Sequence, residues 1–157
     1  MDAFPRTGVV AAVVLAAGLL TGCSSMSLGQ SSSCVDWVVF DTPEDAAADA
    51  DGVVIGRVVG EAGTTRLYDQ DMNVWRVAVD SWVRGDGASE IDVASSPRTC
   101  EEGSPYPDGD PLDAAGDVMI FVRDVDGAFQ TITGYQGVIP ATTDGELPAE
   151  WPADPSD

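Results

Sequence analysis

The side chains that most enzymes use for acid–base and nucleophilic chemistry are sparse in this sequence. It contains no His, and all seven of its basic residues are Arg, so Lys is absent as well. A Ser-His-Asp triad, a Ser-Lys dyad, a Schiff base and an imidazole zinc site are therefore excluded. The sequence also has no nucleophile elbow and no phosphate-binding loop. We therefore assign no catalytic residue, no metal site and no cofactor, and we do not expect an enzyme.

Carboxylates are the chemically active groups that remain, with 27 Asp and Glu residues in the chain. A pair of carboxylates is able to hydrolyse a glycosidic bond, so a carboxylate-based hydrolase stays as an alternative. With so many acids, however, nearly every patch contains a pair. One stretch has calcium-like spacing, Asp69-x-Asp71-x-Asn73, but Val74 stands where an EF-hand loop needs Gly. A solvated hairpin turn is the favoured interpretation of this stretch.

The first of three cysteines follows an apolar run at residues 8–20, within Leu20-Thr21-Gly22-Cys23. A membrane-spanning helix needs about 20 apolar residues, so this run is too short to span and is typical of a signal peptide. The Leu-Thr-Gly-Cys stretch resembles the lipobox of bacterial lipoproteins. That resemblance implies a signal peptide at 1–22, cleavage before Cys23 and a diacylglyceryl group on the Cys23 thiol. The alternatives are an ordinary signal peptide with an incidental cysteine and a soluble protein with an apolar N-terminus.

The remaining cysteines, Cys34 and Cys100, form an even pair once Cys23 carries lipid. Disulfides persist in exported proteins, so we expect a Cys34–Cys100 bridge. It would close a loop of about 65 residues and contribute about 4 kcal/mol in the chain-entropy model. Two free thiols or a metal-binding pair are the alternatives, although no His or further Cys completes a metal site.

Composition divides the chain after the signal peptide into three parts. Residues 23–33 are Ser-rich and uncharged and predict a flexible tether. Residues 34–140 are long enough for one domain, and 141–157 form an acidic, Pro-rich tail that we expect to be disordered unless Trp151 docks back. The net charge of −20 makes nucleic acid an unfavourable partner.

One short helix is expected at the start of the domain, after a strand or buried segment at 35–40. Thr42 is a suitable N-cap, Pro43 suits the first helical position, and two acids follow before an Ala-rich run. The period then changes to two, which is typical of strands. We expect a strand at 53–59, in which Gly56 marks either a bulge or a tight barrel bend, and a turn at 60–64.

Alternation in residues 74–84 predicts a second strand. Its apolar face, Trp75, Val77, Val79 and Val83, is expected to face the core, which leaves Trp82 on the polar side. A turn at 84–87 and a strand at 90–94 follow.

The second half of the domain also predicts strands. The polar loop 101–116 either covers one barrel end or binds something, and strand 117–124 is apolar on both faces, as a doubly covered strand would be. Asp126-Gly127 predicts a hairpin turn before strand 129–133, and 137–140 closes the domain.

A second resemblance covers roughly residues 34–140. The order of a cysteine, a short Ala-rich helix and the segments 50–58, 77–85 and 111–121 resembles the netrin-like, tissue-inhibitor-of-metalloproteinases-like group. The resemblance implies an all-β fold, a small OB-like barrel of about five or six strands with one short helix and one disulfide. Inhibitors in that group bind a protease zinc through a free N-terminal cysteine. Here the matching Cys34 follows a tether, so that activity is not carried over; another small β-barrel or sandwich is the alternative fold.

These observations predict a lipoprotein on the extracytoplasmic face of the cell membrane, held there by lipid on Cys23. Its domain is expected to be a non-catalytic binding module, with an envelope protein as a partner. A structural or assembly factor of the cell envelope is the alternative, followed by the hydrolase.

Overall fold

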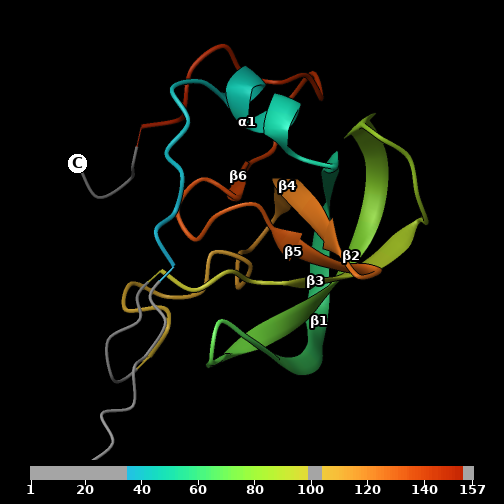
Figure 1. Cartoon of the computed structure of the whole chain (residues 1–157). Helices are drawn as coiled ribbons and strands as arrows, with labels where there is room; N and C mark the ends of the chain where they lie inside the picture. Colours follow the sequence, from blue (N-terminus) through green and yellow to red (C-terminus); the bar gives the residue numbers. More distant parts are fainter. Residues whose placement is uncertain (1–34, 99–103, 154–157) are drawn as a thin grey trace, which may run out of the picture. The chain divides into compact units, whose positions relative to one another are not determined.

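The computed structural model of the chain describes residues 35–98 and 104–153 (Figure 1). They contain one helix and six strands: α1 (Pro43–Asp49), β1 (Gly52–Leu67), β2 (Gln70–Arg84), β3 (Glu90–Ala94), β4 (Asp117–Val125), β5 (Ala128–Thr131) and β6 (Val138–Pro140). Within these ranges no helix is both long and apolar enough to cross a membrane. The predicted signal peptide and tether, together with Cys23, Cys34 and Cys100, lie outside the described residues.

The six strands form one sheet whose pairing closes on itself. The strand order is β1-β2-β3-β5-β4-β6, and an additional pairing of β1 with β4 joins five strands into a ring. Neighbouring strands are antiparallel except β3 and β5, which pair in parallel through Val93 with Phe129 and Ala94 with Gln130. The predicted all-β class with one short helix is therefore confirmed.

Helix α1 begins as the sequence predicts. Thr42 is its N-cap, and the Thr42 hydroxyl accepts a hydrogen bond from the backbone N–H of Asp45 at 3.2 Å. Pro43 stands at the start of the helix, where its missing N–H leaves no donor unsatisfied. The helix buries Ala46 and Ala47 completely against the sheet. Small side chains allow this close approach.

The prediction of a turn at residues 60–64 is wrong. Strand β1 continues to Leu67, and the chain reverses at Tyr68 and Asp69, whose φ angles of 54° and 59° fit a two-residue hairpin turn. The register with β2 shifts between Val58 and Gly60 and again between Glu61 and Gly63. These glycines therefore mark bulges, which bend the strand without ending it.

Of the two alternatives for Gly56, the structure has a bulge beside it, because the register shifts between Ile55 and Gly56. A Cβ on Gly56 would lie 2.3 Å from the carbonyl oxygen of Ala78, so only glycine fits this position. Ile55 pairs with Ser81 and Gly56 with Val79, which leaves Asp80 as the extra residue of β2. One extra residue reverses the alternation of side chains beyond it.

This reversal corrects the prediction that Trp82 lies on the polar side of β2. Trp82 packs against the same apolar cluster as Trp75, Val77 and Val79. Val83, predicted to share that cluster, instead packs against the cluster that α1 covers. Simple alternation fails here because the Asp80 bulge separates Val79 from Trp82.

The apolar residues form two clusters on opposite faces of β1 and β4. Val54, Val118, Ile120 and Val122 belong to one cluster, which also receives Trp75, Val77, Ile91 and Val93 from β2 and β3. Val53, Ile55, Met119 and Phe121 belong to the other, with Ala46, Ala47 and Ala50 at α1. Strand β4 is thus covered on both faces, as its sequence predicts.

Residues 141–153 do not have the expected disorder. Ala141, Leu147 and Trp151 pack against the α1 cluster, and the Trp151 ring lies 5.7 Å from the ring of Phe121. The Trp151 indole N–H donates to the carbonyl oxygen of Phe40 at 2.9 Å. Figure 1 shows this segment in red passing close to α1. The docking of Trp151, which the sequence left open, is thus the arrangement in the structure.

Residues 35–40 do not form a strand, and none of them is fully buried. Val38 and Val39 are exposed, and the Phe40 N–H and C=O bond to the side-chain amide of Gln136 instead of to a strand. The apolar composition of this segment predicts a strand or a buried segment. Instead, the side-chain amide of Gln136 makes the hydrogen bonds to Phe40 that a neighbouring strand would otherwise make.

Candidate binding groove

A groove of about 370 Å³ lies where the β1–β2 hairpin, β3 and the β4–β5 turn come together. The end of β1 contributes Leu67, and β2 contributes Val74. Strands β3 and β5 supply the two parallel-paired neighbours Ala94 and Gln130. Most of the remaining lining is also apolar: Ile91, Val125, Ala128 and Phe129, with Thr65, Asp92 and Gly127. We call this feature the groove.

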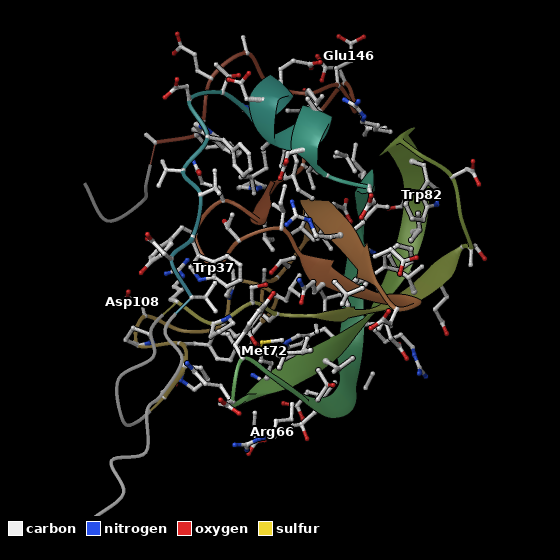
Figure 2. The ribbon with its side chains drawn as sticks, in the orientation of Figure 1. Trp37, Arg66, Met72, Trp82, Asp108 and Glu146 are labelled. Carbon is white, nitrogen blue, oxygen red and sulfur yellow. The ribbon has the colours of Figure 1, made fainter. Side chains whose placement is uncertain are left out.

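Two tight turns border the groove, and local sequence explains both. Tyr68 and Asp69 reverse the chain between β1 and β2, with Arg66 bonded to the Asp69 carbonyl at 3.0 Å. Asp126 and Gly127 reverse it between β4 and β5 with φ angles of 56° and 85°. This Asp-Gly turn is the one predicted from the sequence, and it is confirmed. In Figure 2 Arg66 projects from the lower end of the β1–β2 hairpin, away from Trp82.

Gln130 is the polar side chain that distinguishes the groove from an ordinary apolar surface. Gln130 is 3% exposed, and its amide nitrogen donates to the Tyr68 hydroxyl at 3.1 Å. The amide oxygen, Oε1, is buried and has no hydrogen-bond partner among the described residues. An unsatisfied buried acceptor is unfavourable by about 1–3 kcal/mol. The groove is therefore lined by a group whose hydrogen bonding is incomplete.

Tyr68 is itself held in place by its surroundings. Its backbone adopts the left-handed conformation, which is uncommon for a residue with a side chain. The Trp37 ring packs edge-on against the Tyr68 ring, with centroids 5.6 Å apart and planes at 88°. The Tyr68–Gln130 hydrogen bond and this contact fix the β1–β2 turn beside the groove.

Among the described residues, Asp92 is the one ionisable side chain of the lining, and it is already paired. Arg76 donates to both carboxylate oxygens of Asp92, at 2.9 and 3.1 Å, and also lies 3.6 Å from Glu90. The hydrogen bond from Arg76 lowers the pKa of Asp92, and the same bond, with the nearby negative charges, raises the pKa of Arg76. The groove therefore presents little free charge.

In the polar loop between β3 and β4, Leu112 and Ala114 pack with the cluster that contains Trp75 and Val77. Leu112 is completely buried in that cluster. Asp110 accepts four hydrogen bonds, from the Ser95 hydroxyl, the Leu112 N–H, the Asn73 amide and the Trp75 indole. Burial raises the pKa of the nearby Tyr106 hydroxyl, which donates to the Ser95 carbonyl at 2.7 Å.

The calcium-like stretch does not gather its side chains. Asp69 lies in the turn, Asp71 pairs with Arg66 at 3.3 Å, and Asn73 bonds to Asp110. Within residues 35–98 and 104–153, no three His, Cys, Asp or Glu side chains are placed to hold a metal ion. The favoured interpretation of this stretch as a hairpin turn is confirmed.

The sequence prediction missed the groove entirely. Its lining comes from five separate strands, and only the parallel pairing of β3 with β5 brings Ala94 and Gln130 side by side. The one local signal is Gln130, a polar residue inside a strand that is otherwise largely apolar. Comparison with protein-family models and with curated proteins finds no match to this chain.

Proposed function

We propose that the protein is a membrane-anchored, extracytoplasmic binding module whose groove receives a ligand. The observation that carries the proposal is the groove itself, a mostly apolar concavity that includes Gln130, whose buried amide oxygen has no partner among residues 35–98 and 104–153. Its volume is at the small end of the usual range for ligand pockets, about 300–1,000 Å³. No catalytic role is required of any residue in it.

We further propose that the ring of strands is an OB-type barrel. The closed order β1-β2-β3-β5-β4 and the parallel β3–β5 pair support this assignment. OB barrels bind ligands on the face of their second and third strands, between the β1–β2 and β4–β5 connections. The groove is lined by β2 and β3 and bordered by those two turns. The assignment thus supports binding at this place.

Anchoring rests on the Leu20-Thr21-Gly22-Cys23 sequence. Two or three acyl chains at one cysteine hold a protein durably at a membrane, because each buried CH₂ contributes about 0.8 kcal/mol. Mass spectrometry of the membrane fraction tests this part. We expect a mature chain that starts at a lipidated Cys23, and an intact Met1 or an unmodified Cys23 would contradict it.

Filling the groove tests the binding module. Ala128 is exposed and lines the groove, so Ala128→Trp occupies it without disturbing the core. Ala149, exposed in the C-terminal segment outside the lining, gives the matched control Ala149→Trp. The test uses small-molecule fragments that shift the NMR signals of groove residues. We expect these shifts to be lost in Ala128→Trp and retained in Ala149→Trp. Fragments that bind both variants equally would place binding elsewhere.

A further inference from the structure

We propose that the edge of β1 beside the groove binds an extended, basic segment of a partner protein as an added strand, with one apolar side chain of that segment in the groove. This inference rests on the proposed function, because it names the class of partner that the same groove receives. Three observations lead to it: an unpaired strand edge, the groove that adjoins this edge, and the charge around both.

The second half of β1 has a neighbouring strand on one side only. Strand β1 pairs with β4 over Gly52–Arg57, whereas its pairing with β2 continues to Leu67. Among the described residues, no strand pairs with the other edge of β1 from Val58 to Leu67. Figure 1 shows this part of β1 at the lower margin of the sheet. A strand edge of this kind presents backbone N–H and C=O groups that an extended chain is able to bond.

The hairpin turn determines which backbone groups face this edge. The turn after Leu67 has two residues, so the pair that flanks it, Leu67 and Gln70, is hydrogen-bonded. Such pairs alternate along an antiparallel ladder. Thr65 therefore also bonds to β2, while Thr64 and Arg66 direct their backbone N–H and C=O groups away from β2. Because Thr64 and Arg66 are exposed, these groups are open to a partner strand.

The groove lies on the sheet face that adjoins this edge, because Thr65 and Leu67 both line it. Residues directly opposite each other in neighbouring strands point to the same face. A residue added opposite Thr65 therefore directs its side chain to the face on which the groove lies. A space of about 370 Å³ holds one large apolar side chain, and the apolar neighbours Leu67, Val74 and Phe129 favour its burial.

Charge selects a basic segment. The base on this edge, Arg66, pairs with Asp71 at 3.3 Å. Glu61 in β1 and Asp69 in the turn have no ion pair among the described residues. The net charge of −20 also attracts a basic segment at a distance and repels an acidic one. The same charge disfavours a second copy of this chain as the partner.

The probe is the peptide acetyl-Arg-Thr-Val-Leu-Val-Thr-Arg-amide. Placed antiparallel to β1 with its central Leu opposite Thr65, it has its two Val residues opposite Thr64 and Arg66, where they bond to the free edge. Three comparison peptides each remove one feature. One carries N-methyl groups on both Val residues, one has Ser for the central Leu, and one has Glu for both Arg residues.

Affinities are obtained by NMR titration of the full chain carrying Cys23→Ser, which takes no lipid. We expect the first peptide to bind at least about tenfold more tightly than each comparison peptide. The reason is that each of these loses two hydrogen bonds, one buried apolar side chain or the attraction between opposite charges.

Two variants separate the edge from the groove. Thr64→Pro blocks the edge and keeps the β1–β2 ladder, because the Thr64 N–H faces away from β2 and proline is tolerated at such edge positions. Thr64→Val keeps the N–H, so this matched control should retain binding. In Ala128→Trp, which fills the groove, we expect the peptide with the central Leu to bind no more tightly than the peptide with Ser.

If the N-methylated peptide binds as tightly as its parent, strand addition is overturned. If no peptide shifts any signal of residues 64–67 or of the groove, the inference is overturned as well. In both cases the groove itself is decided separately by the fragments that Ala128→Trp excludes, and failure of those fragments would remove the proposed binding site. The peptide comparison with Thr64 intact decides even if Thr64→Pro does not fold.

Discussion

The indole N–H of Trp37 donates a hydrogen bond to the carbonyl oxygen of Pro97 at 2.8 Å, across 60 residues of chain. Cys34 lies three residues before Trp37, and Cys100 lies three residues after Pro97. Three residues of extended chain span at most about 11 Å. The bond therefore brings together two points of the chain from which both cysteines are within reach of each other.

We predict that Cys34 and Cys100 form a disulfide. Thiol labelling of the mature protein, unfolded without reductant, is expected to find neither thiol free. Reduction should lower the free energy of unfolding by about 4 kcal/mol, because the bridge restricts a loop of about 65 residues in the unfolded chain. Two labelled thiols before reduction would refute the bridge.

Replacing the Trp151 side chain with that of Ala is predicted to destabilise the domain. The indole packs on Phe121 and bonds to the Phe40 carbonyl, which also accepts from the Gln136 amide, so Trp151→Ala removes apolar contact and one of the two hydrogen bonds to that carbonyl. We expect a loss of about 2 kcal/mol in the free energy of unfolding, less than for a fully buried tryptophan, measured by urea denaturation. Glu150→Ala, an exposed neighbour, is the control and should change stability by less than about 0.5 kcal/mol.

If Trp151→Ala is as stable as the control, the C-terminal segment does not contribute to the domain. The disorder expected from the segment's Pro-rich, acidic sequence would then be correct.

The sequence predicts individual strands well where pairing is regular. Strand β4 is predicted correctly because Val118 to Val122 are apolar on both faces, and each face packs against an apolar cluster. The face of β2 on which Trp82 lies is predicted wrongly, because the Asp80 bulge is visible only in the pairing of β2 with β1. The prediction of a turn at residues 60–64 is wrong for a related reason. Gly60 and Gly63 are strong turn signals, yet here they bend a strand that β2 keeps in place.

The groove depends on topology more than on local pattern. Gln130 and Ala94 are far apart in sequence, and no period relates them. Their contact follows from parallel pairing of β3 with β5, which closes the ring. The sequence therefore predicts the class of fold and excludes chemistry that depends on His or Lys. The position of the groove follows only from how the strands pair in the sheet.

Removing Arg76 is predicted to raise the pKa of Asp92. Its carboxylate now has a lowered pKa, chiefly because of the hydrogen bond from Arg76. In Arg76→Gln we expect the pKa to return toward the ordinary value of about 3.9, followed by NMR titration of the Asp92 carboxyl. Arg66→Gln, whose partner is Asp71, is the control and should leave Asp92 unchanged.

The sign of the pH effect follows from the direction of this shift. Since the pKa of Asp92 is lower in the folded protein, the pair stabilises the fold at pH values above the unfolded pKa. That contribution is lost as the pH falls through the folded pKa. Both side chains are exposed, so the effect on stability is small and the pKa is the quantity to measure. An unchanged pKa in Arg76→Gln would mean that the pair does not persist in solution.

Asp110 is predicted to hold the loop between β3 and β4 on the apolar cluster that contains Leu112. Replacing it with Leu leaves the Ser95 hydroxyl, the Asn73 amide and the Trp75 indole without their acceptor. Hydrogen bonds to a charged group each contribute about 1.5–3 kcal/mol, and they are not additive within one network. We therefore expect Asp110→Leu to lower the free energy of unfolding by about 3 kcal/mol, measured by urea denaturation.

Asp110→Asn separates charge from shape. The amide oxygen still accepts two of the four bonds, but its NH₂ group faces donors, so we expect a loss of similar sign and about half the size. Asp113→Asn, exposed in the same loop, removes the same charge without these bonds and should have little effect. Equal losses for Asp110→Asn and Asp113→Asn would show that net charge, and not the hydrogen bonds of Asp110, sets the stability of the loop.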